Sequence, residues 1–464
     1  MSYMGMGSLP VARCPTPPSF LPTAHHPPSP SLPTMAPLHT IPVAKRPPPP
    51  LLQRLRAAAF FIIFNFGCLM VNGAQFAFLL PLRIAYGVLG LFGLGKRLER
   101  AYKDGVRYTK GGFGCLLVLM CQWFAPSTIR VTIEKEGMGK FVDLDVVRRD
   151  ERGNFDYLDL PQRFVLIGNH QVYLDWWYMW CLTYFIGPQG VHKNVYITLK
   201  NSLKWVPVVG WGMQFFSFIF LARSWAADRA QLASSLSRLG MEAEEEDNPL
   251  AFILYPEGTL VSDQTRPISK KYADKLGITD MSHTLLPRST GLHYSLRSLA
   301  PRIPNLKLLD VTIVYPGIPP MGYGQDYYTM RSVFLDGVYP PLIHMHMRMF
   351  DVASEVPIGD LSATRANVVP PSGNPGKGKS TVEVDIPEAE KGVFDAWLRQ
   401  LWTEKDTTIE SFHKNGATGH ASEGKGPDVG VDLQLRLKRT REYLDAFCFL
   451  LPAGVVYLLG RARS

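Results

Sequence analysis

The sequence has few charged residues and few cysteines for its length. Asp, Glu, Lys and Arg make up 19% of the 464 residues, below the quarter that is usual in soluble globular proteins. This shortage favours contact with a membrane. The six cysteines are scattered, and several lie in apolar runs, so they indicate buried thiols of a reducing compartment and no disulfide framework. The sequence also has no Asn-x-Ser/Thr site for glycosylation, as expected of a domain that does not face the secretory lumen.

Several motifs of other protein classes are missing as well. The absence of Gly-x-Ser-x-Gly disfavours a lipase-type serine hydrolase. Zinc-finger spacings and basic stripes with stacked aromatics are absent, so we expect no nucleic acid partner. The run from Gly90 to Lys96 has the spacing of a phosphate-binding loop, but Arg97 stands where the Mg²⁺-binding Ser or Thr belongs. His344 and His346 have no third ligand nearby, and we predict no metal.

The sequence is rich in apolar residues and in positive charge. Apolar residues make up 46% of the chain, enough for a sizeable core, and the formal net charge is +9. An excess of positive charge suits an anionic surface or an anionic ligand.

The composition changes along the chain and predicts its organisation. Residues 57–82 are almost wholly apolar, long enough to cross a bilayer core of about 30 Å as one span or to enter it as a hairpin. Residues 114–123 are a shorter apolar helix suited to the membrane interface. The predicted segments are a disordered Pro-rich tail (1–50), membrane-anchoring helices (51–126), a catalytic domain (127–360), a linker (361–386), an amphipathic helix packed on the domain (387–415), a second linker (416–432) and a C-terminal helix that is a candidate membrane segment (433–464).

Within residues 127–360, short apolar runs alternate with helical patterns. The predicted strands are 129–133, 164–167, 195–198, 218–221, 251–254 and 311–314, and the predicted helices are 171–185, 226–239 and 267–276. This alternation predicts an α/β fold with a mixed, largely buried sheet flanked by helices, preceded by the N-terminal membrane helix or hairpin.

Two polar runs follow two of the predicted strands. Asn169-His170 comes directly after residues 164–167, with Asp175 one helical turn further on. A histidine that takes a proton needs a group that fixes its tautomer and stabilises its cation, and a nearby Asp does both. Alone, the pair would by default be interpreted as a structural histidine and a helix-start carboxylate. The second run, Tyr255 to Thr259, follows residues 251–254, and two such runs together favour a catalytic site.

These runs resemble the H-x-x-x-x-D and P-E-G-T blocks of the glycerophospholipid acyltransferase superfamily, and the resemblance extends from about Arg163 to Phe412. Residues 200–223 and 286–291 resemble its second and fourth blocks. Residues 310–316 and 341–346 resemble the eukaryotic branch of lysocardiolipin and lysophosphatidylinositol acyltransferases, including fungal members. Leu260 stands where many members carry Arg, which leaves open whether Arg266 supplies that charge.

The resemblance implies transfer of a fatty acyl group from acyl-CoA to a free hydroxyl of a lysophospholipid. His170 would be the general base and Asp175 would orient its ring. The thioester is already activated, so we expect no covalent acyl-enzyme and no cofactor, with acyl-CoA as co-substrate.

The acceptor phosphate needs cationic or N–H partners. Arg223 is the leading candidate because guanidinium offers forked donors, and Gly258 and Thr259 could offer backbone N–H groups. Glu257 would position Arg223 or a substrate hydroxyl.

Two further basic residues and two further functions remain open. Lys200 and Arg288 are candidates for phosphate or CoA contacts, or are merely solvated surface residues. An alternative substrate is lysophosphatidate or glycerol 3-phosphate in de novo phosphatidate synthesis, and a third interpretation is a silent membrane scaffold. The resemblance implies the endoplasmic reticulum membrane, with the mitochondrial outer membrane as the alternative.

Overall fold

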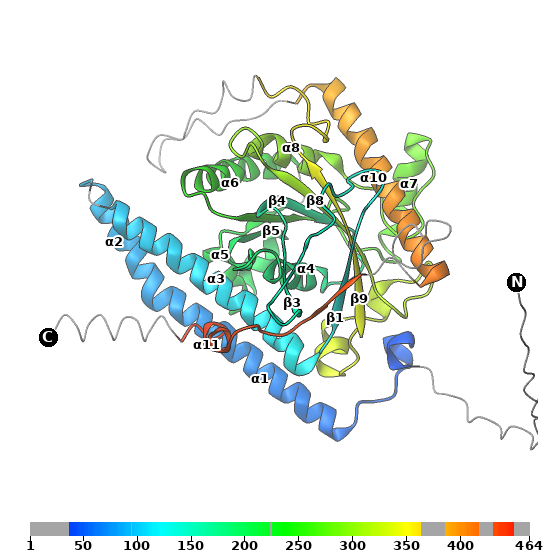
Figure 1. Cartoon of the computed structure of the whole chain (residues 1–464), viewed down its shortest axis with the longest axis horizontal. Helices are drawn as coiled ribbons and strands as arrows, with labels where there is room; N and C mark the ends of the chain where they lie inside the picture. Colours follow the sequence, from blue (N-terminus) through cyan, green and yellow to red (C-terminus); the bar gives the residue numbers. More distant parts are fainter. Residues whose placement is uncertain (1–36, 94, 223–224, 363–385, 417–429, 450–464) are drawn as a thin grey trace, which may run out of the picture. The chain divides into compact units, whose positions relative to one another are not determined.

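The computed structural model describes residues 37–93, 95–222, 225–362, 386–416 and 430–449 (Figure 1). Of the predicted Pro-rich tail, residues 1–36 lie outside this part. Residues 37–50 do not behave as a disordered tail, because they form the short 3-10 helices η1 (Leu38–Thr40) and η2 (Val43–Lys45). Arg46 then anchors them, since its guanidinium donates to the carbonyl of Tyr327 (2.7 Å) and to the hydroxyl of Ser332.

A mixed eight-stranded sheet forms the centre of the protein, in the order β10-β1-β9-β8-β4-β7-β5-β6. Its strands are β1 (Thr128–Ile133), β4 (Arg163–Gly168), β5 (Val195–Lys200), β6 (Ile219–Leu221), β7 (Leu250–Leu254), β8 (Lys307–Val314), β9 (Leu342–Asp351) and β10 (Val431–Gln434). The run from β8 to β6 is parallel, β9 is antiparallel to β8, and β10 is antiparallel to β1. The predicted fold class, α/β with a mixed sheet, is confirmed.

The middle strands are apolar throughout because both faces of the sheet are covered. In β4, Phe164 and Leu166 join the core beneath α3 (Lys96–Phe124) and α4 (Asp175–Tyr184). Val165 and Ile167 point to the opposite face, which α6 (Trp225–Glu245), α8 (Ser289–Leu299) and α10 (Glu388–Asn415) cover. The remaining described elements are a small hairpin of β2 (Val147–Arg149) and β3 (Phe155–Leu158), α5 (Val209–Phe215), α7 (Arg266–Leu276), α11 (Thr440–Asp445) and the short helices η4 (His192–Asn194), η5 (Asn201–Trp205), η6 (Gly324–Asp326) and η7 (Arg331–Leu335).

The predicted membrane-anchoring region forms two long helical arms. α1 (Leu51–Ala74), η3 (Gln75–Leu79) and α2 (Leu80–Gly90) make one continuous helix, and α3 returns alongside it (Figure 1). Within the described ranges, the helix Leu51–Gly90 is long and apolar enough to cross a membrane, a test that a core helix of a soluble protein also passes. The interface prediction for residues 114–123 is wrong, since Cys115–Cys121 are buried inside the protein core.

The C-terminal prediction also needs correction. Residues 431–434, which the sequence divided between a linker and a helix, are strand β10 and extend the sheet beside β1. Arg130 and Asp432 join the two strands by a forked ion pair (2.7 and 2.8 Å). The predicted helix is limited to α11 among the described residues, and residues 450–464 lie outside them.

Candidate active site

The two polar runs leave the sheet side by side. β4 and β7 are parallel and in register, with Ile167 opposite Leu254, so the residues that follow them emerge at the same edge. Asn169 ties the first run to β8, because its side-chain amide donates to the carbonyl of Ile313 (2.9 Å) and accepts from the N–H of Ile313 (2.8 Å).

His170 and Asp175 form the predicted pair. The His170 Nδ1 atom lies 2.8 Å from Oδ2 of Asp175, which is the first residue of α4 and fully buried. The same carboxylate oxygen accepts from the backbone N–H groups of Gln171 (2.7 Å) and Val172 (3.0 Å). The other oxygen accepts from the hydroxyl of Tyr315 (2.6 Å). Since Nδ1 is committed to Asp175, Nε2 is the imidazole atom available to take a proton.

The His170 ring is also fixed from one face. The Tyr255 ring stacks on it at a centroid distance of 4.3 Å and an angle of 19°. The side chain of His170 keeps 19% of its surface exposed, enough for a substrate hydroxyl to reach it. The main chain of His170 binds the second run, because its N–H donates to Glu257 (3.2 Å) and its carbonyl accepts from the N–H of Val261 (3.0 Å).

The carboxyl of Glu257 is buried and points into the protein. Besides the N–H of His170, Oε1 accepts from the indole N–H of Trp402 (3.3 Å), and Oε2 accepts from the N–H of Leu285 (3.2 Å). Burial raises the pKa of Glu257 to about 8, although these three N–H donors oppose the rise. The hydrogen bonds of Glu257 thus join three segments of the chain, and its predicted partner Arg223 lies outside the described residues.

A cavity of about 420 Å³ opens beside His170. It is lined by the predicted residues His170, Lys200, Gly258 and Arg288 and by the apolar side chains of Leu199, Leu221, Leu232, Leu254 and Leu292. Thr290 and Gly291, in the first turn of α8, also line it. The first N–H groups of a helix lack partners within the helix and favour an anion. The cavity, which we call the His170 cavity, therefore combines an apolar wall with two basic side chains, the start of a helix and one carboxylate, that of Asp228, which accepts the N–H of Ala222 (2.6 Å).

Two predicted phosphate donors are placed differently from the expectation. The N–H of Gly258 donates to the carbonyl of Tyr255 (2.9 Å) in a turn where Gly258 adopts φ +71°, so it is not available to a phosphate. Thr259 lines a neighbouring cavity of about 390 Å³, which shares Arg288 and Thr290 with the first.

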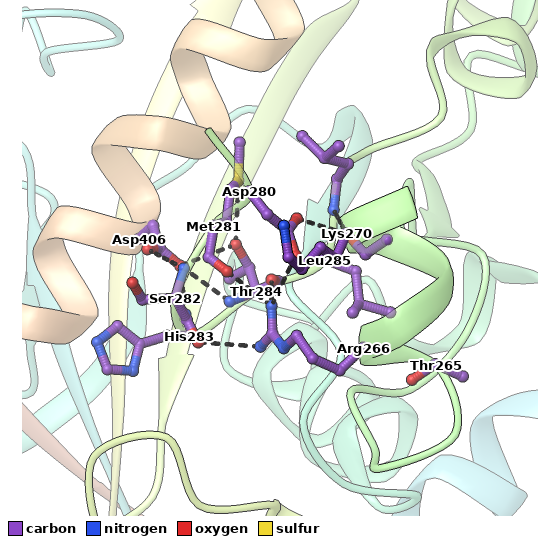
Figure 2. A network of polar contacts seen from close by, with 12 residues as sticks. Thr265, Arg266, Lys270, Asp280, Met281, Ser282, His283, Thr284, Leu285 and Asp406 are labelled. Carbon is purple, nitrogen blue, oxygen red and sulfur yellow. Dashed lines mark hydrogen bonds and ion pairs between the residues drawn. The ribbon is translucent and has the colours of Figure 1, made fainter. Parts of the chain in front are cut away.

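Arg266 does not take the place of the missing arginine after Thr259. Its guanidinium donates to the carbonyls of Met281 (2.7 Å), Ser282 (3.0 Å) and Thr284 (2.6 Å), as Figure 2 shows. These bonds hold the loop of residues 280–285, so Arg266 shapes the surroundings of the site and contributes no charge to the His170 cavity.

The sequence missed three residues that hold the site. Tyr315 lies directly after the predicted strand 311–314, and its hydroxyl reaches Asp175. Trp402 was predicted only as part of the apolar face of the amphipathic helix 387–415. Asp406, one turn further along α10, accepts the N–H groups of three successive residues, Ser282 (2.8 Å), His283 (2.7 Å) and Thr284 (2.9 Å) (Figure 2). Its spacing gave no hint of that role.

Within the ranges that the structure describes, no three His, Cys, Asp or Glu side chains gather closely enough to hold a metal ion. The expectation that the reaction needs no metal or cofactor stays a prediction.

The fold and the site define an α/β protein in which a buried carboxylate orients an imidazole beside an open cavity. Residues 151–315 match a family model described as Acyltransferase. The chain is 32% identical to 2-acyl-1-lysophosphatidylinositol acyltransferase of Saccharomyces cerevisiae, over 77% of this chain and 84% of that protein. It is also 30% identical to lysocardiolipin acyltransferase 1 of Danio rerio, over 54% of this chain and 53% of that protein. The chain belongs to the acyltransferase family.

Proposed function

We propose that the protein transfers a fatty acyl group from acyl-CoA to a free hydroxyl of a lysophospholipid. The names of the yeast and zebrafish relatives support lysophospholipids as acceptors. The observation that carries the proposal is the 2.8 Å contact between His170 and Asp175 at a cavity that also contains Lys200 and Arg288.

The pair suits alcohol acylation. The acceptor hydroxyl gives its proton to Nε2 of His170 while its oxygen attacks the thioester carbonyl of acyl-CoA. The negative charge of Asp175 stabilises the resulting imidazolium. The tetrahedral intermediate then breaks its carbon–sulfur bond, and the departing CoA sulfur takes the proton back from His170. The acyl group goes directly to the alcohol, with no covalent acyl-enzyme.

The cavity suits the rest of both substrates. Lys200, Arg288 and the start of α8 would bind phosphate by charge and N–H donors. The leucine side chains on its wall would accommodate acyl-chain carbons. Arg223 and Thr259 remain candidates for phosphate contacts from the sequence, and Glu257 acts by holding the backbone of His170.

The apolar N-terminal helix supports an enzyme that works at a membrane. Large apolar side chains of α1 and α2 stay exposed on the protein surface, among them Phe61, Ile62, Leu69 and Ile84. A bilayer would cover them and would also hold the lipid substrates. We propose the endoplasmic reticulum membrane, with the mitochondrial outer membrane as the alternative.

An acceptor panel tests the proposal. The full chain, purified in detergent or lipid nanodiscs, is incubated with labelled oleoyl-CoA and lysophosphatidylinositol, lysophosphatidylethanolamine, lysophosphatidate or glycerol 3-phosphate. We expect labelled diacyl product from at least one lysophospholipid with a head group. Highest rates on lysophosphatidate or glycerol 3-phosphate would favour the de novo alternative. Absence of acyl transfer to every acceptor would rule out the proposed function.

A further inference from the structure

The neighbouring cavity of about 390 Å³ has a chemistry of its own. Six of its lining residues carry a hydroxyl: Thr259, Thr265, Ser269, Tyr272, Ser289 and Thr290. We call it the hydroxyl cavity. It shares Arg288 and Thr290 with the His170 cavity, so a molecule bound across Arg288 would reach both. Its volume lies within the range of about 300–1,000 Å³ that is common for small-molecule sites.

Two of the six hydroxyls are used by the protein itself. Thr265 donates to the carbonyl of Leu260 (2.6 Å), and Ser269 bridges Asp280 (2.7 Å) and the N–H of Leu286 (3.1 Å). Those two form a rigid wall. For the other four, the described part of the chain provides no side-chain hydrogen bond. A hydroxyl both donates and accepts, so a group of free hydroxyls matches a ligand that is itself a set of hydroxyls.

The charge of the hydroxyl cavity argues against a polyanion. Arg288 is the one basic residue among its described lining residues. Of the two acidic lining residues, Asp395 forms an ion pair with Arg399, and burial raises the pKa of Glu257 to about 8. The nucleotide end of CoA carries several phosphate charges and would find one cation there. An uncharged polyol can instead donate hydrogen bonds to Asp395, because a carboxylate only accepts.

We propose that the hydroxyl cavity binds the polyol head group of the acceptor lipid, with the phosphate that joins it to glycerol at Arg288. The glycerol hydroxyl would then lie on the His170 side of Arg288. This inference rests on the proposed function and adds to it the head-group class and its site. It fits the inositol of the acceptor in the name of the yeast relative.

The double variant Tyr272→Phe/Ser289→Ala tests the inference. It removes two free hydroxyls and no charge, and Tyr272 is 51% exposed, so the fold should tolerate the change. The measured quantity is the ratio of kcat/KM on lysophosphatidylinositol to kcat/KM on lysophosphatidate, which has no polyol beyond its phosphate. We expect this ratio to fall about tenfold, the effect of losing two ordinary hydrogen bonds. Tyr157→Phe, a half-buried tyrosine on β3 away from both cavities, is the matched control and should leave the ratio within twofold.

A second measurement distinguishes the possible ligands of the hydroxyl cavity. Glycerophosphoinositol, a soluble head-group probe, should inhibit the wild-type enzyme competitively against lysophosphatidylinositol and should inhibit the double variant about tenfold less well. An unchanged ratio would overturn the inference, as would a selective loss on lysophosphatidylethanolamine or a rise in KM for acyl-CoA alone. If the wild-type protein acylates no lysophospholipid, the proposed function itself has failed. If the wild-type protein acylates lysophospholipids and the double variant keeps the same kcat/KM ratio, only the proposed head-group site is excluded.

Discussion

The two halves of the site are held in place in different ways. In the His170 turn, residues 169–175, the imidazole is oriented by a residue of the same turn, because Asp175 binds its Nδ1 atom and accepts two backbone N–H groups of the turn. Ile313 and Tyr315, at the end of β8, support the turn from a distant part of the chain. The Glu257 loop, residues 255–261 together with 280–286, is held by Arg266 of α7 and by Trp402 and Asp406 of α10. The contacts from α10 join residues that are 122 to 145 positions apart in the chain. The orientation of the His170 imidazole thus depends mainly on its own turn, and the Glu257 loop that binds its backbone depends in part on the docking of a distant helix.

A buried polar network fixes α10 on the sheet. Lys405 lies 2.8 Å from Asp310 on β8 and donates to the carbonyl of Val311 (2.9 Å). Arg348 on β9 binds Asp310 (2.8 Å) and the carbonyl of Leu401 (2.9 Å). Buried charges of this kind are costly unless every partner is present, so they favour one position of the helix. α10 can therefore transmit its own position to the Glu257 loop.

The largest effect is expected in the His170 turn. His170→Ala removes the proposed base, and general-base catalysis is worth about 10²- to 10⁴-fold, so kcat should fall by that factor. The unfolding free energy should fall by no more than about 3 kcal/mol, because the buried carboxylate of Asp175 loses one hydrogen bond and keeps those from Gln171, Val172 and Tyr315. Initial rates with labelled acyl-CoA and chemical denaturation check the two halves of the prediction.

The control for this prediction is His39→Ala on η1, whose imidazole lies outside both cavities. It should keep wild-type rates. Activity of His170→Ala within tenfold of wild type would exclude His170 as the general base.

A second substitution weakens the contacts between α10 and the Glu257 loop, made by Trp402 and Asp406, and leaves His170 unchanged. Asp406→Ala leaves the N–H groups of Ser282, His283 and Thr284 without their acceptor. We expect a loss of about 2–3 kcal/mol in unfolding free energy, since a net hydrogen bond is worth roughly 1 kcal/mol. Because the Glu257 loop supports the backbone of His170, kcat should also fall, by far less than in His170→Ala.

Glu388→Ala, at the exposed start of the same helix, is the matched control and should cost less than about 0.5 kcal/mol. Equal stability of Asp406→Ala and the control would show that α10 does not hold the loop.

The same contrast explains what the sequence could predict. His170 and Asp175 follow a strand at a short spacing, and local pattern is what a sequence shows directly. The parallel strands β4 and β7 were predicted from their apolar runs, and parallel pairing brings their ends together. The α/β class and the pairing of His170 with Asp175 were thus within reach.

The contacts between α10 and the Glu257 loop could not be predicted from the sequence, because they join segments that are far apart in the chain. Trp402 and Asp406 have the pattern of any amphipathic helix, and periodicity does not reveal which backbone groups their side chains meet. Tyr315 reads as the end of a strand. The burial of Cys115–Cys121 under the sheet and the pairing of β10 with β1 likewise depend on tertiary packing, which made an interface helix and a linker look reasonable.

An effect that is smaller per pH unit, and that depends on pH, is expected from Glu257. Its pKa of about 8 in the folded protein lies above the ordinary value of 4.5, so between these values the folded protein holds a proton that the unfolded chain has lost. The stability that Glu257 contributes should therefore be greatest below pH 4.5 and fall as pH rises towards 8, by at most about 1.4 kcal/mol per pH unit. Glu257→Gln should remove this slope. Denaturation at several pH values checks it, and an unchanged slope would assign the pH dependence to other groups.

The smallest effect is expected from Trp402→Phe, which removes the hydrogen bond between α10 and Glu257 and keeps an aromatic ring in the core. The indole N–H of Trp402 lies 3.3 Å from Oε1 of Glu257 and lowers the pKa of that carboxyl. Without it, the pKa of Glu257 should rise further above its ordinary value, so the fall of stability with pH should extend to higher pH than in the wild type. The accompanying loss in unfolding free energy should be about 1 kcal/mol.

Trp397→Phe, on the same helix and packed on Phe394 and Phe350, is the control and should leave the pH dependence unchanged. Identical pH profiles for the two variants would mean that α10 touches the Glu257 loop without tuning it, and the distant half of the site would then be a matter of packing alone.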